Sequence, residues 1–342
     1  MHSTPWRIRP LFAALIALLA VGFVAFAACG ADEDADSDTG KPTATGGGTE
    51  YSSLSGSIAV DGSSTVGPIT EAVAEEFGKV SNVDVSVGIS GTGGGFEKFC
   101  KGETDINDAS RAIKDAEKTA CQGGGVEYTE FKVGVDGLTV VVNGGNEFVE
   151  CLTFSQLKTL WDQGSTVQNW SQVDPSLPAE SIKLYGPGPD SGTFDYFTEE
   201  VNGKAKQSRS DYTANEDDYT LVRGVENDEN ALGYFGFAYY QGAAGQLKAV
   251  KIDKDADAKG TPVAADKRKG CVEPTSATIN DNSYPLSRPL YIYVSRDALA
   301  RAEVKGFVEF YLDNAKELVE DVGYIPLQDG EYEKGLSTLA SS

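Results

Sequence analysis

Histidine is almost absent from this sequence. The one histidine among the 342 residues is His2, which lies within an apolar leader. The rest of the chain therefore cannot build a Ser-His-Asp triad, a Cys-His nucleophile pair or a histidine metal cluster. A hydrolase would have to work with carboxylates alone, and no two carboxylates stand at a spacing typical of such a pair. We expect no enzyme activity, no metal site and no cofactor.

Two glycine-rich stretches also lack the features of known catalytic or nucleotide-binding loops. The loop at residues 91–95 has no Gly-Lys-Ser/Thr ending and does not fit Gly-x-Gly-x-x-Gly, so it is not a nucleotide loop of either kind. The stretch 88–92 falls one residue short of a nucleophile elbow. Binding without catalysis is the function that these absences favour.

Positive charge is scarce. The sequence has 29 Lys and Arg against 52 Asp and Glu, for a net charge of −23, and removing Arg7 and Arg9 with the leader leaves 27 against 52. This balance excludes a nucleic-acid ligand. A small anion bound by local dipoles in a closed pocket is compatible with it, because salt water screens distant charges within roughly 10 Å.

The start of the sequence predicts export. Arg7 and Arg9 precede an apolar run at 11–27 that is short for a membrane span, and the run ends in Phe-Ala-Ala-Cys29, which resembles a bacterial lipobox. We expect a signal peptide at 1–28, a lipid on Cys29, a flexible Gly/Thr/Ser/Asp-rich tether at 29–53 and a place on the outer face of the cell membrane. An uncleaved anchor is the alternative.

Four further cysteines, Cys100, Cys121, Cys151 and Cys271, would then lie in an oxidising compartment. Their even number and the absence of a C-x-x-C spacing predict two disulfides rather than a zinc site. We favour Cys100 with Cys121, because the pair brackets one compact segment, and Cys151 with Cys271, because that pair would staple the middle region to itself. The other two connectivities remain open.

Short strands alternate with helices, which indicates an α/β fold with mostly parallel sheets. Three strand-to-helix junctions carry hydroxyl groups, and the strands before them are expected at 57–60, 84–87 and 182–185. Backbone N–H groups and the helix dipole make such helix starts suited to anions. The candidate ligand residues at these junctions are Ser64, Thr65, Val66, Ser90, Asp190, Ser191, Gly192 and Thr193. A further strand is expected at 105–109, and Arg111 follows it. The planar, charged guanidinium of Arg111 is suited to binding an oxyanion.

Two strongly apolar strands are expected to connect two lobes of the fold. Residues 136–143 are expected to cross into a second lobe, and residues 284–294 are expected to return. This predicts lobe 1 at 54–135 and 291–342 and lobe 2 at 136–290. Amphipathic helices are expected at 152–161 in lobe 2 and at 302–319 in lobe 1.

The junction motifs together carry a family resemblance. Gly62-Ser-Ser-Thr-Val-Gly-Pro, Gly88-Ile-Ser-Gly-Thr-Gly-Gly-Gly-Phe, Asp105-Ile-Asn-Asp-Ala-Ser-Arg-Ala-Ile and Tyr185-Gly-Pro-Gly-Pro-Asp-Ser-Gly-Thr-Phe-Asp-Tyr-Phe resemble the periplasmic phosphate-binding protein of bacterial phosphate ABC importers. The last motif is similar to the cyanobacterial-type subgroup. The resemblance implies a class II periplasmic binding protein. In that fold, two α/β lobes joined by two crossing hinge strands close on one phosphate, and the protein delivers the ion to a permease. We expect a monomer.

The resemblance also implies ligand contacts at Thr65, Val66, Ser90, Ser191, Gly192 and Thr193. Two positions depart from the best-known pattern. Arg111 replaces an aspartate that accepts the phosphate proton, and Pro187 replaces an arginine. We hypothesise that Arg111 takes over the cationic role, with a plain salt bridge as the alternative.

Loss of the usual proton acceptor leaves open how phosphate would be distinguished from sulfate, since only phosphate carries a proton to donate. Asp61 and Asp190 are the candidate acceptors, and capping of their own turns is the alternative role for both. The alternative functions are binding of another tetrahedral oxyanion, such as sulfate, and secreted hydrolysis.

Overall fold

The structure is a computed structural model that describes residues 51–189 and 191–342. The expected signal peptide, the lipidation site Cys29, the tether up to residue 50 and the candidate ligand residue Asp190 lie outside the described residues. Within the described ranges, no helix is both long enough and apolar enough to cross a membrane.

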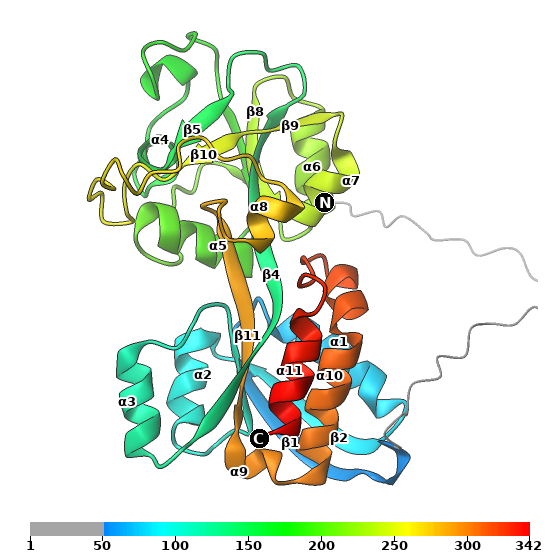
Figure 1. The fold of residues 1–342 in the computed structure, drawn as a ribbon. Coiled ribbons are helices and arrows are strands. Elements are labelled where there is room, and N and C mark those ends of the chain that lie inside the picture. The colour runs from blue at the N-terminus through cyan, green and yellow to red at the C-terminus, as the bar shows by residue number, and fades with distance from the viewer. Residues whose placement is uncertain (1–50, 190) are drawn as a thin grey trace, which may run out of the picture. The chain divides into compact units, whose positions relative to one another are not determined.

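Two α/β lobes are joined by two long strands, β4 (Tyr128–Asn143) and β11 (Ser287–Ser295) (Figure 1). The lobe at the bottom of Figure 1, here called the first lobe, contains both the early and the late elements of the described chain. Its elements are β1 (Ser55–Gly62), α1 (Gly67–Gly78), β2 (Asn82–Ile89), α2 (Gly91–Phe99), β3 (Ile106–Ala109), α3 (Asp115–Gly123), α9 (Arg296–Leu299), α10 (Ala302–Asp321) and α11 (Glu331–Ala340).

The second lobe, at the top of Figure 1, is formed by the chain between the two long strands. Its elements are β5 (Cys151–Thr153), α4 (Phe154–Trp161), β6 (Lys183–Gly186), α5 (Gly192–Phe197), β7 (Thr213–Ala214), α6 (Asp218–Glu226), β8 (Ala231–Gly236), α7 (Phe237–Ala243), β9 (Leu247–Ala249), β10 (Lys251–Asp253) and α8 (Ser276–Asn280). A π-helical turn, Thr198–Asn202, continues α5.

One sheet runs through both lobes in the strand order β2-β1-β3-β11-β4-β8-β6-β7, and β9 also pairs with β4. The outer pairs β1–β2, β1–β3, β6–β7 and β6–β8 are parallel, as expected. Every pair that involves β4 or β11 is antiparallel. For β4 and β11 the reason is that β4 leaves the first lobe in the direction opposite to that in which β11 returns to it.

The crossing segments and the amphipathic helices lie where the sequence predicts them, with shifted boundaries. β4 begins eight residues before the expected crossing at Asp136. Leu152 belongs to strand β5 rather than to the helix after it, since Thr153 caps α4 and accepts a hydrogen bond from the Gln156 N–H. Helix α10 buries Val304, Phe307 and Tyr311 against the core, as its periodicity indicates.

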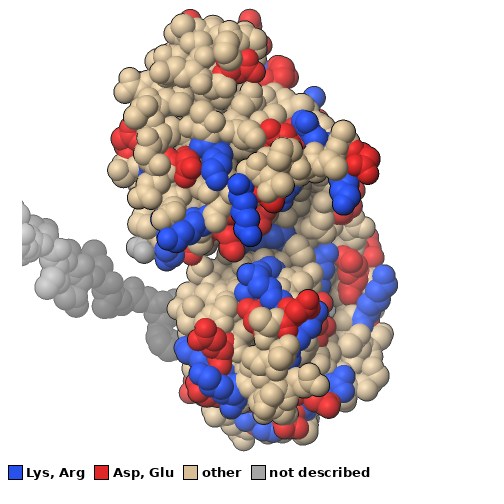
Figure 2. Space-filling view, turned by 90° about the vertical axis from the view of Figure 1, so that its left-hand side faces the viewer, with Lys and Arg blue, Asp and Glu red and all other residues tan. Residues whose placement is uncertain are grey.

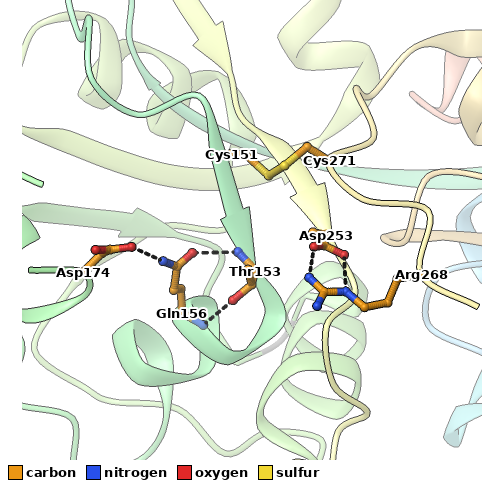
Figure 3. The surroundings of a disulfide bond; sticks show 7 residues. All are labelled: Cys151, Thr153, Gln156, Asp174, Asp253, Arg268 and Cys271. Carbon is orange, nitrogen blue, oxygen red and sulfur yellow. Dashed lines mark hydrogen bonds and ion pairs between the residues drawn. A yellow bond between two sulfur atoms is a disulfide. The ribbon is translucent and has the colours of Figure 1, made fainter. Parts of the chain in front are cut away.

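Both favoured disulfides are present, Cys100–Cys121 and Cys151–Cys271. Figure 3 shows the second disulfide beside β5 and β10, which pair with each other. Near this disulfide, the Arg268 guanidinium forms an ion pair with Asp253, the last residue of β10. The segment 254–270 continues from β10 at one end, and the ion pair and the disulfide fasten its other end to the second lobe.

We expect the two disulfides to contribute unequally to stability. A cross-link stabilises mainly by reducing the conformational freedom of the unfolded chain, and Cys151–Cys271 spans 120 residues against 21 for Cys100–Cys121. By the chain-entropy relation, removing the longer link costs roughly 5 kcal/mol and the shorter roughly 3 kcal/mol. Urea unfolding of the two double Cys→Ala variants measures this difference. A larger loss for Cys100→Ala/Cys121→Ala would contradict it.

Candidate functional site

The first junction leads from β1 into α1 and rests on β3. Gly62 has a φ of 147°, and a Cβ there would lie 2.2 Å from the Asp108 carbonyl oxygen, so glycine is required. The Ser63 N–H donates to that carbonyl at 2.9 Å. The Ser63 hydroxyl accepts a hydrogen bond from the Thr65 N–H at 3.1 Å. These contacts hold Thr65, which is 2% exposed, at the start of α1.

The second junction is organised by a buried carboxylate. Ser90 is the N-cap of α2, and its hydroxyl donates to Oδ1 of Asp61, while the Lys98 ammonium donates to Oδ2. Burial alone would raise the pKa of Asp61, but the Lys98 ammonium and the Ser90 hydroxyl outweigh it and lower that pKa. Asp61 therefore fixes Ser90, and both of its carboxylate oxygens already have donors.

The third junction is the start of α5, in the second lobe. Ser191 is the N-cap, and its hydroxyl accepts a hydrogen bond from the Thr193 N–H at 3.1 Å. Gly192 lies directly against the first junction, because a Cβ there would be 2.6 Å from the Thr65 hydroxyl oxygen. The absence of a side chain at Gly192 thus lets two helix starts from different lobes meet.

Arg288, which the sequence analysis missed, stands where these two junctions meet. Its Nε donates to Oδ2 of Asp136 at 2.9 Å, and its Nη2 donates to the Thr65 hydroxyl at 2.7 Å and to the Gly192 carbonyl at 3.1 Å. The Tyr196 ring lies 4.2 Å from the centre of the guanidinium. Arg288 is 8% exposed and Asp136 is 1% exposed, so the ion pair is buried. A charged residue inside an otherwise apolar crossing strand was the available signal.

A cavity of about 770 Å³ lies beside Arg288. Four of the sequence-predicted ligand residues line it, namely Ser64, Thr65, Arg111 and Gly192. Val66, Ser90, Ser191 and Thr193 are each next in the chain to a lining residue but do not line the cavity themselves, and neither does Asp61. The structure therefore brings residues of all three junctions to one hollow, with Ser90 represented there by its neighbour Gly91.

Arg111 lies at the first-lobe wall of this cavity with its guanidinium already engaged. Nη1 and Nη2 donate to the two carboxylate oxygens of Glu117 at 2.8 and 2.7 Å. Burial of Glu117 would raise its pKa, but the Arg111 guanidinium more than offsets this and the pKa is lowered. Arg111 remains 28% exposed. Arg111 thus forms a salt bridge and also lines the cavity. Its role in ligand binding stays a prediction.

The charge around the cavity is opposite to that of the chain as a whole. Six basic residues line it, namely Arg111, Lys114, Lys254, Lys267, Lys269 and Arg288, against three acidic ones, Asp195, Glu199 and Glu200. Figure 2 shows Lys and Arg side chains on both sides of the hollow between the lobes. The cavity is therefore a local positive region on an acidic protein.

Asp195, on the first turn of α5, is one of the three acidic residues that line the cavity. Its Oδ1 is buried and has no hydrogen-bond partner among the described residues, while Lys206 lies 3.8 Å from Oδ2. Burial raises the pKa of Asp195, and the charges of Lys206 and Arg288 oppose that rise. Asp195 thus lines the cavity, and its buried Oδ1 is left without a hydrogen-bond donor from the described residues.

The combined site offers hydroxyl groups, helix-start N–H groups and a fixed guanidinium, all of them donors. Such a set suits a small oxyanion, because charge-assisted hydrogen bonds from arginine and backbone amides are the strong ones. Among residues 51–189 and 191–342, no group of three or more Cys, Asp or Glu side chains is placed to hold a metal ion.

Comparison with known proteins agrees with this chemistry. A profile of the PBP superfamily domain matches residues 40–315. The chain is 46% identical to Protein SphX of Synechocystis over 289 residues, which are 83% of this chain and 82% of the relative. It is 40% identical to the phosphate-binding protein PstS of Staphylococcus saprophyticus over 314 residues, 91% of this chain and 89% of the relative.

Solved structures show the same fold. A possible phosphate-binding protein from Planctomyces limnophilus is 50% identical, with a TM-score of 0.79 over 84% of this chain and 99% of that one. A candidate phosphate ABC transporter substrate-binding protein from Clostridium perfringens, solved with bound phosphate, is 26% identical. Its TM-score is 0.52 over 80% of this chain and 100% of that one.

We expect loss of Arg288 to destabilise the protein through the charge it leaves behind. In Arg288→Met the Asp136 carboxylate is buried without its partner, and the free energy of unfolding should fall by about 3 to 5 kcal/mol. The double variant Arg288→Met/Asp136→Leu should recover most of this loss, because neither charge is then buried. Urea unfolding at neutral pH gives both values.

The matched control is Arg111→Met, which breaks a partly exposed pair and should cost about 1 kcal/mol or less. If the Arg288 single and double variants were equally unstable, the buried charge would not be the cause.

Proposed function

Because this chain belongs to the PBP superfamily, we propose that it binds inorganic phosphate between its two lobes and delivers the ion to an ABC importer. The observation that carries the proposal is the meeting of Thr65, Gly192 and Arg288 at one side of a shared cavity. The relatives named above support phosphate as the ion. Nothing in the donor set of the site favours a hydrolase.

The proposed ligand contacts are those expected from the sequence with one addition, Arg288. They are Ser64, Thr65, Val66, Ser90, Arg111, Asp190, Ser191, Gly192, Thr193 and Arg288. The hydrogen bonds of Arg288 to the described residues involve its Nε and Nη2, which leaves Nη1 to donate to an anion. Each charge-assisted bond contributes roughly 1.5 to 3 kcal/mol, and a micromolar complex needs about 8 kcal/mol net. Several such bonds together are therefore sufficient for a micromolar complex, including the free-energy cost of closing the lobes.

Closure of the lobes is part of the proposal. The lobes are taken as 54–135 with 291–342 and as 136–290, so that β4 and β11 form the hinge. Closing about these strands would bring Ser90 and Arg111, on the first lobe, toward an ion held at Gly192 on the second. Arg111 would then add a second cation to the one that Arg288 supplies.

The proposed setting is the outer face of the cell membrane. A lipid on Cys29 would hold the protein there as a monomer, with the tether spanning the distance to the permease. The two disulfides support an oxidising compartment, because disulfides persist outside the reducing cytosol.

Calorimetric titration of the purified protein with phosphate tests the function. We expect one phosphate per chain with micromolar or tighter affinity, and a thermal shift that grows with phosphate concentration. Gly192→Ala should weaken binding at least tenfold, because its Cβ would lie 2.6 Å from the Thr65 hydroxyl oxygen. The control Gly78→Ala, where a Cβ meets nothing within 4 Å, should bind normally. A wild type that gives neither heat nor a thermal shift with millimolar phosphate would refute the proposal.

Selectivity for phosphate requires a group that accepts the proton of the bound ion. Asp61 and Asp190 are the acceptors proposed from the sequence. Both oxygens of Asp61 already have donors, and Asp190 lies outside the described residues. Asp195 is a third candidate, since it lines the cavity and its buried Oδ1 accepts no hydrogen bond from any described residue.

We expect Asp195→Asn to reduce the difference in affinity between phosphate and sulfate. Sulfate is fully ionised and repelled by a carboxylate, whereas phosphate can donate its proton to one. Competition binding should therefore show the sulfate-to-phosphate ratio of dissociation constants falling at least tenfold in Asp195→Asn. Glu199→Gln, a second cavity-lining acid from the same segment, is the control. An unchanged ratio in Asp195→Asn with a changed one in Asp61→Asn would assign the role to Asp61.

A further inference from the structure

Part of the second-lobe side of the cavity is made by the segment 254–270, which the proposed ligand contacts do not use. Lys254, Lys267 and Lys269 of this segment line the cavity. The segment begins directly after β10, which is paired with β5, and it ends at the Cys151–Cys271 disulfide (Figure 3). Both of its ends are therefore fixed to the body of the second lobe.

The interior of this segment is also held in place. The Val263 N–H donates to the Asp255 carbonyl at 2.8 Å. The Asp257 carboxylate accepts hydrogen bonds from the Lys259 and Thr261 N–H groups at 2.9 and 2.7 Å. The Lys158 ammonium, from α4, donates to the Ala258 carbonyl at 3.1 Å. The backbone that carries the three lysines is thus a built wall of the cavity.

The charges of these lysines are largely uncompensated. Lys267 and Lys269 are exposed and form no ion pair with any described residue. Lys254 is paired with Glu200 at 3.0 Å. Across the cavity stand Arg111 and Lys114 of the first lobe. A protein with a net charge of −23 thus presents at the wall of this cavity two exposed lysines, Lys267 and Lys269, that lack an ion-pair partner among the described residues.

Exposure separates the lysines from the inner contacts, because Lys267 and Lys269 are exposed whereas Thr65 and Arg288 are buried. A water molecule takes up about 30 Å³ of the liquid, and a tetrahedral oxyanion is only a few times larger. The cavity of about 770 Å³ therefore has room for an anion beside the lysines as well as one at Thr65 and Gly192. Local charge of this kind raises the rate at which a small ion enters a cleft by 10-fold to about 1000-fold, and salt weakens the effect.

We propose that Lys254, Lys267 and Lys269, here called the lysine wall, form an outer capture site for small inorganic oxyanions. The wall counteracts the repulsion of the acidic surface, draws the anion into the cavity and passes it to the inner contacts. This inference rests on the proposed function, since it concerns how phosphate arrives. It assigns the wall to the rate of association and leaves the final complex to Thr65, Gly192 and Arg288.

Stopped-flow measurement of phosphate association by intrinsic fluorescence tests the wall. The variant is Lys254→Gln/Lys267→Gln/Lys269→Gln. Its control is Lys101→Gln/Lys118→Gln/Lys334→Gln, which changes the net charge equally at exposed first-lobe positions away from the cavity. At about 20 mM salt the wall variant should associate at least tenfold more slowly than wild type, and the control less than twofold more slowly. The dissociation rate should stay unchanged, and the difference should vanish near 0.5 M salt.

The outcomes separate the two proposals. A wild type that binds no phosphate refutes the proposed function itself. A wild type that binds, with wall and control variants associating at equal rates, overturns the capture site alone. Faster dissociation from the wall variant would place the lysines in the final complex and would likewise overturn it. If the triple variant fails to fold by circular dichroism, Lys267→Gln and Lys269→Gln singly decide the matter, each expected to slow association about twofold.

Discussion

A guanidinium held away from water is the constraint on which the rest of this structure depends. Removing a charge from water costs several kcal/mol unless fixed partners surround it. For Arg288 those partners come from three places: Asp136 on β4, Thr65 in the first lobe and Gly192 in the second. Satisfying this one charge therefore sets the relative positions of the crossing strands and of two helix starts. The bond to the Gly192 carbonyl further demands that no side chain stand between the junctions.

The sequence was sufficient wherever the signal was local. Glycine, proline and hydroxyl residues marked the three junctions, apolar runs marked β4 and β11, and the cysteine spacing favoured the two disulfides that the structure contains. The antiparallel pairing of the crossing strands and the placement of Leu152 in β5 depend on tertiary partners, which no local pattern reveals.

Arg288 shows most clearly what a sequence pattern leaves out. In the register of β4 and β11, Arg288 lies directly opposite Asp136, so the two form a cross-strand pair. The residues stand 152 positions apart in the chain. Until the register is known, nothing in the sequence links these two charges, whereas Arg111 stands within a recognisable motif and is noticed first. The same holds for the charged segment 254–270. Its proposed role depends on its position in the wall of the cavity, which the sequence does not show.

The strand order has a consequence for how the polypeptide acquires its shape. In the sheet, β11 lies between β3 and β4, yet it is synthesised after the entire second lobe. Until β11 is available, β3 and β4 each have one unpaired edge. Such edges can pair with strands of other chains. The contiguous second lobe is able to form in the meantime. Newly made protein is accordingly most vulnerable to aggregation in the interval before the chain from Ser287 onward becomes available to pair.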